Sequence, residues 1–433
     1  MNKHPNTVKN TLLSLISEMS ANPVPYVKNP GKDFTRDRKL PFEAVVKSLI
    51  SMGGNSIYKE LLEANDYAPD TATTSAFVQQ RDKILPSAFE FLFRMFTETH
   101  SNIRKHRGYR IFAVDGSDLN SVGNPDDADS FFQNRPGEKG YNLTHLNALY
   151  DLCNKIYVDA LPEPRRLASE RRTLTEMVRR SSFTDKVIVI ADRGYESYNI
   201  FAHIENKGWN YVIRVKDLNR HGIVSTLELP DGEFDVCVSR ILTRKQTKEV
   251  KSNPDIYRFM PSISPFDFFD PANPFYTMSF RIVRFKMADD SYETLITNLD
   301  TKAFPSHEIK ELYRMRWGIE TAFRELKYTV GLTSFHTKKQ EHITQEIFAR
   351  LIMYNFAEMI TSHVVISKAD TKHTYQVNFT VATHICRHFL RSNAPPPDID
   401  ALIRKNVLPV RAGRYAKRAI RYKSAVSFLY RVA

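Results

Sequence analysis

Apolar residues recur at helical spacing through the first quarter of the chain. They lie three and four positions apart in Phe42–Met52 and again in Phe89–Phe96. Gly53-Gly54 and Leu85-Pro86 punctuate this region, as expected between helices. The pattern predicts a helical N-terminal region over residues 1–105.

The next segment, residues 106–217, mixes strands and helices. Three strands come first and form a meander, and after them helices and strands alternate along the chain. The predicted strands are Tyr109–Val114, Leu143–Leu152, Ile156–Leu161, Val187–Ala191 and Tyr211–Lys216, and the predicted helices are Ala168–Ser181 and Tyr198–Lys207. This order indicates the first part of a mixed α/β domain.

The remaining pattern predicts three more segments. Residues 218–292 are strand-like around a stretch rich in Pro, Asp and Phe, which indicates a β-rich insertion. Residues 293–365 return to the first domain with a strand and a long helix that begins at Ser306 and ends near Val330. Residues 366–433 are predicted to form a helical, basic C-terminal region.

Composition and charge narrow the choice of partner. Hydrophobic residues make up 42% of the 433 residues and charged residues 26%, the balance of a soluble globular protein. The net charge is +13, and nine basic residues with no acidic one follow Ala401. This excess predicts a polyanionic partner, either nucleic acid or an acidic membrane surface, and charge alone does not choose between them.

Other bulk features exclude several classes of protein. The three cysteines are far apart, which argues against a disulfide framework or a zinc site and favours a reducing compartment. No stretch approaches the roughly 18 apolar residues that span a bilayer, and the N-terminus is too weakly apolar for a signal peptide. We therefore expect a cytoplasmic protein without membrane contact.

Two acidic residues follow predicted strands of the α/β domain. Asp115 comes after Tyr109–Val114, and Asp192 comes directly after Val187–Ala191. Residues at the ends of strands often form active sites, because the following loop leaves their side chains at an open edge. The alternative is that each Asp is a turn former or a helix cap. Asp118, which follows in loop-like sequence, is expected to be solvated.

A third carboxylate lies on a polar stripe of the long helix. At 100° per residue, Glu320 falls on a narrow face that is separate from the apolar one. That face carries Tyr313, Arg316, Glu320, Arg324 and Lys327. The alternative is a solvated face with ion pairs between residues four apart, such as Arg316 with Glu320. Ion pairs give no reason for Tyr313, or for Trp317 beside the stripe.

These residues carry a resemblance to a known family. Tyr313, Arg316, Glu320 and Lys327 match the Y-(2)-R-(3)-E-(6)-K signature of the insertion-sequence-four family of bacterial DD-E transposases. The Asp-Gly-Ser at Asp115, the later Ala-Asp-Arg-Gly-Tyr and the β-rich insertion agree in order, and the match covers about Tyr109–Asn355. The resemblance implies a ribonuclease-H-like α/β core with a β-rich insertion, flanked by helical regions.

The resemblance also implies a chemistry. Asp115, Asp192 and Glu320 would be the catalytic, metal-binding triad for two Mg²⁺ ions, with Mn²⁺ able to substitute. The expected reaction is cut-and-paste transposition, in which transposon ends are cleaved and joined to target DNA. Family members commonly pass through a DNA hairpin, so this intermediate is an expectation by resemblance alone.

Several residues are expected to contact double-stranded DNA, both transposon ends and target. The basic side chains are expected to bind phosphate groups, and the hydroxyl of Tyr313 is expected to donate a hydrogen bond to one of them. Trp317 either stacks on a displaced base or packs against a strand. The expected DNA-binding residues are Tyr313, Arg316, Trp317, Arg324, Lys327, Lys338 and Lys339. End recognition is assigned to the helical residues 1–105 and non-specific contact to the basic tail. Because two ends must meet, we expect a homodimeric synapse, associated with the nucleoid.

Two other functions remain open from the sequence. One is a catalytically silent regulator that descends from a transposase and binds DNA without cutting it. The other is a nuclease that has the same core and performs no strand transfer. The complete triad and signature argue against decay, and cleavage and joining assays separate the three functions.

Overall fold

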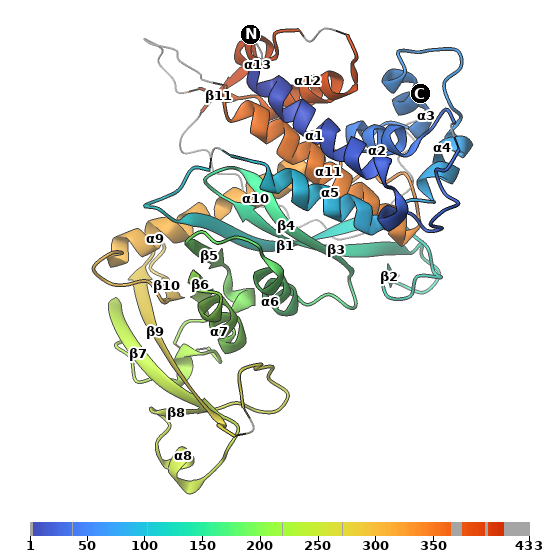
Figure 1. Cartoon of the computed structure of the whole chain (residues 1–433). Helices are drawn as coiled ribbons and strands as arrows, with labels where there is room; N and C mark the ends of the chain where they lie inside the picture. The colour runs from blue at the N-terminus through green and yellow to red at the C-terminus, as the bar shows by residue number, and fades with distance from the viewer. Residues whose placement is uncertain are drawn as a thin grey trace.

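The computed structural model describes residues 3–36, 38–101, 103–218, 220–270, 272–364, 375–394 and 397–410. A large mixed sheet runs through the molecule (Figure 1), in the order β2-β3-β1-β5-β6-β10-β9-β7-β8, with β4 paired to β3. Its strands are β1 (Arg110–Val122), β2 (Phe131–Phe132), β3 (Tyr141–Asp151), β4 (Ile156–Pro164), β5 (Val187–Ala191), β6 (Asn210–Val215), β7 (Phe234–Thr243), β8 (Tyr257–Phe259), β9 (Phe275–Lys286) and β10 (Tyr292–Thr297). The predicted mixed α/β class is confirmed.

The first five major strands follow one topology. β1, β3 and β4 form an antiparallel meander; β5 pairs parallel with β1 on its other side, and β6 pairs parallel with β5. In space the order is therefore β4-β3-β1-β5-β6. β5 is buried along its whole length, because its run Val187–Ala191 is apolar on both faces, as expected for a parallel strand covered by helices.

Helices cover both faces of this part of the sheet. In Figure 1, α6 (Glu170–Arg180) and α7 (Tyr198–Asn206) lie on one face, and helices from both ends of the chain lie on the other. The second group is α1 (Lys3–Ala21), α2 (Phe42–Ser51), α3 (Ile57–Ala64), α4 (Thr74–Arg81), α5 (Pro86–Glu98), α11 (Gln340–Thr361), α12 (Phe379–Arg391) and α13 (Ile399–Lys405). The predicted helical character of residues 1–105 agrees with α1 to α5.

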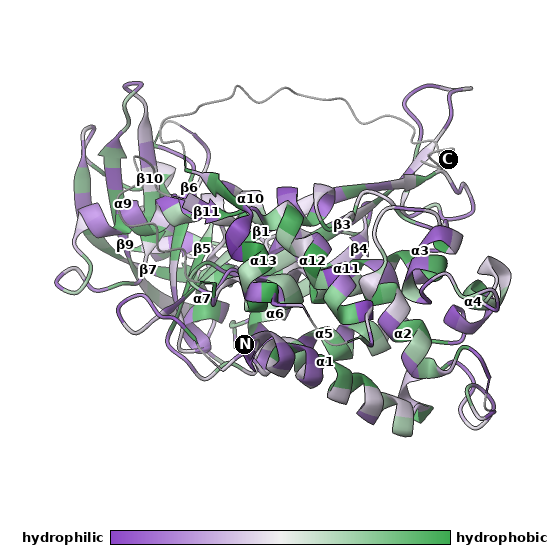
Figure 2. Ribbon diagram, turned by 90° about the horizontal axis from the view of Figure 1, so that it is seen from above, coloured by the Kyte–Doolittle hydropathy of each residue, from purple (hydrophilic) through white to green (hydrophobic). Residues whose placement is uncertain are grey.

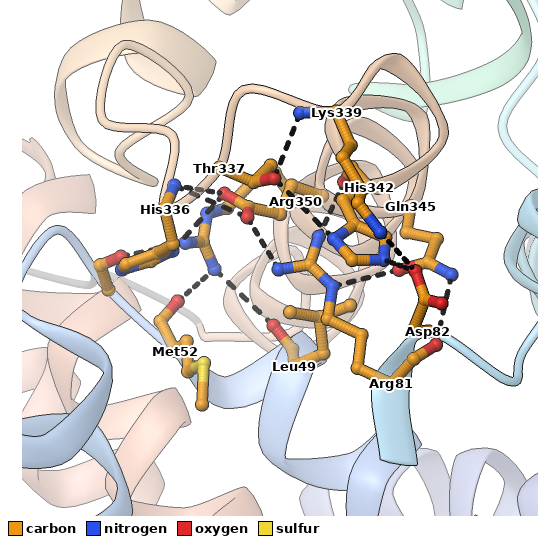
Figure 3. A network of polar contacts seen from close by, with 12 residues as sticks. Leu49, Met52, Arg81, Asp82, His336, Thr337, Lys339, His342, Gln345 and Arg350 are labelled. Carbon is orange, nitrogen blue, oxygen red and sulfur yellow. Dashed lines mark hydrogen bonds and ion pairs between the residues drawn. The ribbon is translucent and has the colours of Figure 1, made fainter. Parts of the chain in front are cut away.

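Helix α11 is the centre of the helical layer. It contacts α1, α2, α5, α12 and β4, and nearly every residue from His342 to Thr361 is buried. A polar network fixes its first turns to the N-terminal helices (Figure 3), with Glu346 of α11 paired to Arg81 of α4 at 2.9 Å. Both side chains are 1% exposed. The N-terminal helices are thus anchored to the core by charge as well as by apolar packing.

The segment predicted as an insertion extends the central sheet. β9 pairs antiparallel with both β10 and β7, and β10 pairs with β6, so one continuous sheet joins core and insertion. Half-buried and exposed residues alternate along the first six positions of β7, in keeping with a strand that is covered on one face. In Figure 2 the end of the molecule that holds β7 and β9 lies opposite the end that holds α3 and α4. The short helix α8 (Lys248–Ser252) and β8 lie at the far end of this arm (Figure 1).

The predicted long helix from Ser306 is two helices. α9 (Ser306–Met315) and α10 (Trp317–Tyr328) meet at Arg316. The backbone tightens there, because Arg316 N donates to Tyr313 O at 3.0 Å and Ile319 N to Arg316 O at 3.1 Å, each only three residues back. The face arithmetic for an unbroken helix therefore fails across this joint.

The C-terminal region is described as far as residue 410. After α13 it holds β12 (Val407–Pro409), which pairs antiparallel with β11 (Tyr375–Val377). Most of the basic tail predicted after Ala401 lies outside the described residues. Within the part that the structure describes, no helix has the length and apolar character needed to cross a bilayer.

Candidate active site

Strand register brings two carboxylates to the same level of the sheet. β1 pairs parallel with β5 so that Ala113 lies opposite Ile190, and two more steps in this register place Asp115 level with Asp192. β5 ends directly before Asp192, as predicted. β1 continues to Val122, so Asp115 lies inside a strand and the prediction that it ends one is wrong.

Helix α10 supplies the third carboxylate. It packs against β1, and Glu320 lies in its first turn. The charges of Asp192 and Glu320 both raise the pKa of Asp115, so both carboxylates lie within electrostatic reach of it. Burial, together with these two charges, raises the pKa of Asp115 to about 6, although the Gly116 N–H and Arg316 act in the opposite direction.

The alternatives left open by the sequence also hold in part. Asp192 caps the short 3₁₀ turn Arg193–Tyr195, because its Oδ1 accepts from Gly194 N at 2.8 Å. Glu320 Oε1 accepts from Arg316 Nη2 at 2.9 Å, which is the predicted ion pair. A cap and an ion pair each hold a carboxylate in a fixed direction, so these local roles are compatible with a role at a shared centre.

Tyr313 and Arg316 are more buried than a polar stripe predicts. Tyr313 is 5% exposed and belongs to an apolar cluster with Leu312 and Ile309. Burial raises the pKa of its hydroxyl. Its placement on a solvated stripe is therefore wrong, because α9 packs its ring against the sheet. Tyr313 Oη and Arg316 Nε are both buried and have no hydrogen-bond partner of normal geometry among the described residues.

Lys327 lies beside the carboxylates on the next turns of α10. Its Nζ donates to the backbone oxygen of Asp118 in β1 at 3.0 Å. Burial lowers the pKa of Lys327, while the charge of Asp115 raises it. Lys327 is therefore a half-buried cation directed at β1, close to the centre that Asp115 occupies.

The other predicted DNA contacts lie further from the carboxylates. Trp317 is 60% exposed, which argues against packing on a strand, and its ring lies 5.1 Å from Arg316 Cζ. Arg324 is exposed at the rim of a cavity of about 570 Å³ between α10 and the C-terminal helices. Lys339 pairs with Asp82 at 3.0 Å, and Lys338 is exposed beside it. Trp317 and Arg324 of this group lie on α10 beside the signature residues, whereas Lys338 and Lys339 lie beyond its end.

A second polar cluster lies behind the two aspartates and was missed. His145 Nδ1 contacts Asp118 Oδ1 at 2.5 Å, and its Nε2 lies 3.4 Å from Glu170 Oε1. A Cβ at Gly116 would lie 2.9 Å from Glu170 Oε1, and one at Gly194 would lie 3.1 Å from Glu170 Oε2. Glu170 thus lies close to both glycines that follow the two aspartates.

Few features of the sequence predict this cluster. Asp118 was expected to be solvated, but it belongs to β1 and its side chain is only 15% exposed. The clue available was the pair of glycines after Asp115 and Asp192, since glycine allows close approach of a neighbouring group. Most of the arginines around α6 serve the protein itself, as Arg180 does by pairing with Asp159.

The three carboxylates are of the chemical type that binds divalent cations. Among the described residues, no group of three or more His, Cys, Asp or Glu side chains is arranged to hold a metal ion as it stands. Carboxylate oxygens are nevertheless the preferred protein ligands of Mg²⁺. Burial is the main cause of the raised pKa of Asp115, and the charges of Asp192 and Glu320 add to it. A cation bound there would offset these negative charges, and Asp115, Asp192 and Glu320 are the residues that would hold it.

Comparison with known proteins agrees with the motif. Residues 106–356 match the transposase DDE domain. The chain is 20% identical over 333 residues to the transposase InsG for insertion sequence element IS4 of Escherichia coli (strain K12), covering 74% of this chain and 70% of that protein. The piggyBac transposase, solved in a synaptic complex with hairpin DNA, aligns with a TM-score of 0.48 and 11% identity over 96% of this chain and 88% of that one.

The resemblance inferred from the signature residues is thereby confirmed at the level of family. The match to the DDE domain includes both aspartates, the insertion and the signature helix, and covers more than half of the chain. The chain belongs to the transposase DDE-domain family and is a DNA transposase of the IS4 type, an enzyme that cleaves DNA and transfers its strands.

Proposed function

We propose that this transposase cuts and pastes its own element from one centre formed by Asp115, Asp192 and Glu320. The observation that carries the proposal is that Asp192, directly after β5, and Glu320, on α10, both act electrostatically on Asp115 of β1, with Asp115 level with Asp192 in the β1–β5 register. Each comes from a rigid element, and two are oriented by a local hydrogen bond from the backbone. Such rigid placement is what a reaction at a single phosphodiester requires.

The core is assigned to the ribonuclease-H-like class. Its support is the strand order β4-β3-β1-β5-β6, in which an antiparallel meander is followed by two strands parallel to the first. In this arrangement the first aspartate lies on the central strand and the second on its parallel neighbour. The domain limits 106–217 and 293–365 for the two parts of the core follow the same assignment, with 218–292 between them.

Asp115, Asp192 and Glu320 would hold the divalent cations, Mg²⁺ or Mn²⁺. When bound, two such ions activate the attacking oxygen and neutralise charge on the phosphate and the leaving oxygen. The protein's own contribution is placement. Gly116 and Gly194 each donate a backbone N–H to the aspartate before them, so both carboxylates keep their direction while the ligands exchange.

The signature residues are assigned to the phosphate of the transposon end. Tyr313 Oη and Arg316 Nε are buried without a partner of normal geometry, a costly state that an incoming phosphate oxygen or water would relieve. Lys327 adds a positive charge on the other side of Glu320 along α10. Exposed Trp317 is available to stack on a base displaced near the cut, as a hairpin intermediate requires.

The partners follow from the reaction. Double-stranded DNA is bound as transposon end and as target, with residues 1–105 assigned to end recognition. Two ends are joined to one target, which calls for a homodimeric synapse in the cytoplasm at the nucleoid. Among the wider set of predicted contacts, exposed Lys338 and Lys339 are assigned to duplex further from the cut, and exposed Arg324, one turn after Glu320 on α10, to phosphates nearer to it.

The decisive experiment combines cleavage with joining. Purified protein is incubated with Mg²⁺, a target plasmid and a duplex that carries the inverted repeats flanking the reading frame. Asp115→Asn, Asp192→Asn and Glu320→Gln should each lower cleavage by at least about a thousandfold while duplex binding persists. Glu311→Gln, an exposed α9 variant paired only with Arg314, is the matched control. Retained cutting by any triad variant would remove that residue from the centre.

The phosphate assignment has its own test. Lys327→Ala should reduce end cleavage far more than it reduces duplex affinity. Duplex binding uses many cations and loses only one of them, whereas the scissile phosphate loses the positive charge next to it. Exposed Lys302→Ala is the control and should leave both unchanged. An equal loss of affinity and cleavage in Lys327→Ala would contradict a local role at the cut.

A further inference from the structure

The far end of the β arm carries an excess of positive charge. We call residues 240–261 the insertion tip; it comprises the end of β7, α8 and β8. It contains six basic residues and two acidic ones: Arg240, Arg244, Lys245, Lys248, Lys251 and Arg258 against Glu249 and Asp255. A concentration of one sign on a projecting element favours a polyanionic partner.

The same arm neutralises its cations elsewhere. Near its base, Arg281 pairs with Asp235 at 2.6 Å and Arg284 with Asp217 at 2.9 Å. Among the described residues, no basic side chain of the insertion tip has a carboxylate within ion-pair distance. Arg240 donates to the backbone oxygen of Tyr257 at 3.0 Å instead, which leaves its charge uncompensated. The contrast indicates that the tip is kept positive.

A groove in the tip collects these charges. Its volume is about 490 Å³, and it is lined by three cations, Arg240, Lys251 and Arg258, by aromatic Tyr257 and Phe259, and by no carboxylate. Arg240 is 1% exposed, and its Nε has no hydrogen-bond partner within the described residues. Arg258 Nε is also buried and also has no hydrogen-bond partner within the described residues. Donors left unsatisfied beside a groove favour an acceptor from outside the protein.

We propose that the insertion tip binds the phosphodiester backbone of duplex DNA at a second site away from the catalytic centre. This proposal extends the transposase function to a surface that the reaction itself does not use. β9 has 12 residues and so spans about 36 Å at about 3.3 Å per residue. One turn of B-DNA is about 34–36 Å. The arm is therefore long enough to reach the duplex about one helical turn from the base of the arm.

Salt dependence of DNA binding tests this surface directly. The probe is a fluorescent 40-base-pair duplex of random sequence, measured with the full chain in the absence of Mg²⁺. Each phosphate contact contributes about 0.9 to the slope of log K against log salt. Lys251→Ala with Arg258→Ala should therefore lower that slope by about two. An unchanged slope would overturn the proposal.

Two further variants keep the test sharp. Lys286→Ala removes a cation at the opposite end of β9, where Lys286 pairs with Asp290 at 2.7 Å, and should keep the wild-type slope. If Arg258→Ala fails to fold, Lys248→Glu with Lys251→Glu replaces it, since both lysines are exposed on α8. Charge reversal should lower the slope further, and a wild-type slope would again refute the site.

This readout is separate from the catalytic proposal. The binding slope is measured without Mg²⁺ and on a duplex of random sequence, so it reports phosphate contacts and not cleavage. A tip variant with a normal slope would refute the second site and leave the cleavage results untouched. Conversely, retained cleavage by Glu320→Gln would refute the catalytic assignment without affecting the binding slope.

Discussion

Replacing Glu346 should destabilise the fold more than a typical point mutation. Glu346 Oε1 accepts from Arg81 Nη1 at 2.9 Å, its carboxylate also accepts from His336 N at 3.2 and 3.3 Å, and Arg350 lies nearby (Figure 3). Although burial alone would raise the pKa of Glu346, these cationic neighbours hold it well below its usual range. Glu346→Leu leaves the Arg81 guanidinium, 1% exposed, without its counter-charge. Breaking such a buried pair costs about 3–5 kcal/mol.

Urea unfolding followed by fluorescence of the two tryptophans measures this loss. The matched control is Glu341→Gln on the same helix, whose carboxylate pairs with Lys28 at 2.7 Å but is 54% exposed, so its loss should cost less than about 1 kcal/mol. Arg81→Met combined with Glu346→Leu should recover part of the stability, because the buried charge is gone. A double variant as unstable as the sum of both single variants would refute the reasoning.

Two other predictions concern close packing and pH. Gly116→Ala places a Cβ 2.5 Å from His145 Nε2, so it should lower the free energy of unfolding by about 1–3 kcal/mol and reduce cleavage. The control is Gly232→Ala, whose Cβ would lie in open space and should change neither stability nor cleavage. Equal behaviour of the two variants in unfolding and cleavage assays would contradict this. Burial lowers the pKa of His342 to about 4. Between about pH 6.5 and 4 the unfolded chain therefore binds a proton that the folded chain does not, and the free energy of unfolding decreases by up to about 3 kcal/mol as the pH is lowered. His342→Gln should flatten this fall in pH-dependent unfolding, and an unchanged slope would exclude His342 as its source.

Periodicity predicted the elements of the core because their sequences are strongly patterned. Val187–Ala191 is an apolar run of strand length, and the structure gives β5 the same limits. Periodicity failed where tertiary contacts determine how far an element extends. β1 runs past Val114 to Val122 because β3 pairs with it residue by residue, and the polar side chains of that stretch gave no apolar alternation to reveal the extension.

The candidate site was predicted by motif and could not have been placed by periodicity alone. The spacing of Tyr313, Arg316, Glu320 and Lys327 identified the residues, but the assumption of one helix misjudged Tyr313, since the chain tightens at Arg316. Glu170 was not predicted, because its position depends on two glycines that are distant in sequence. No local sequence pattern indicates that a side chain distant in sequence will lie this close to two glycines.

The distribution of charge has a physical consequence for how the protein handles DNA. Cations at the base of the arm are paired, as Arg281 is with Asp235, so they add little to long-range attraction. The cations of the insertion tip, which pair with no carboxylate among the described residues, lie on β7, α8 and β8, whereas Lys327 lies on α10. A duplex held at both points is fixed in direction as well as position. Orientation of this kind lets a single centre address one phosphodiester among many, since non-specific contacts alone allow sliding.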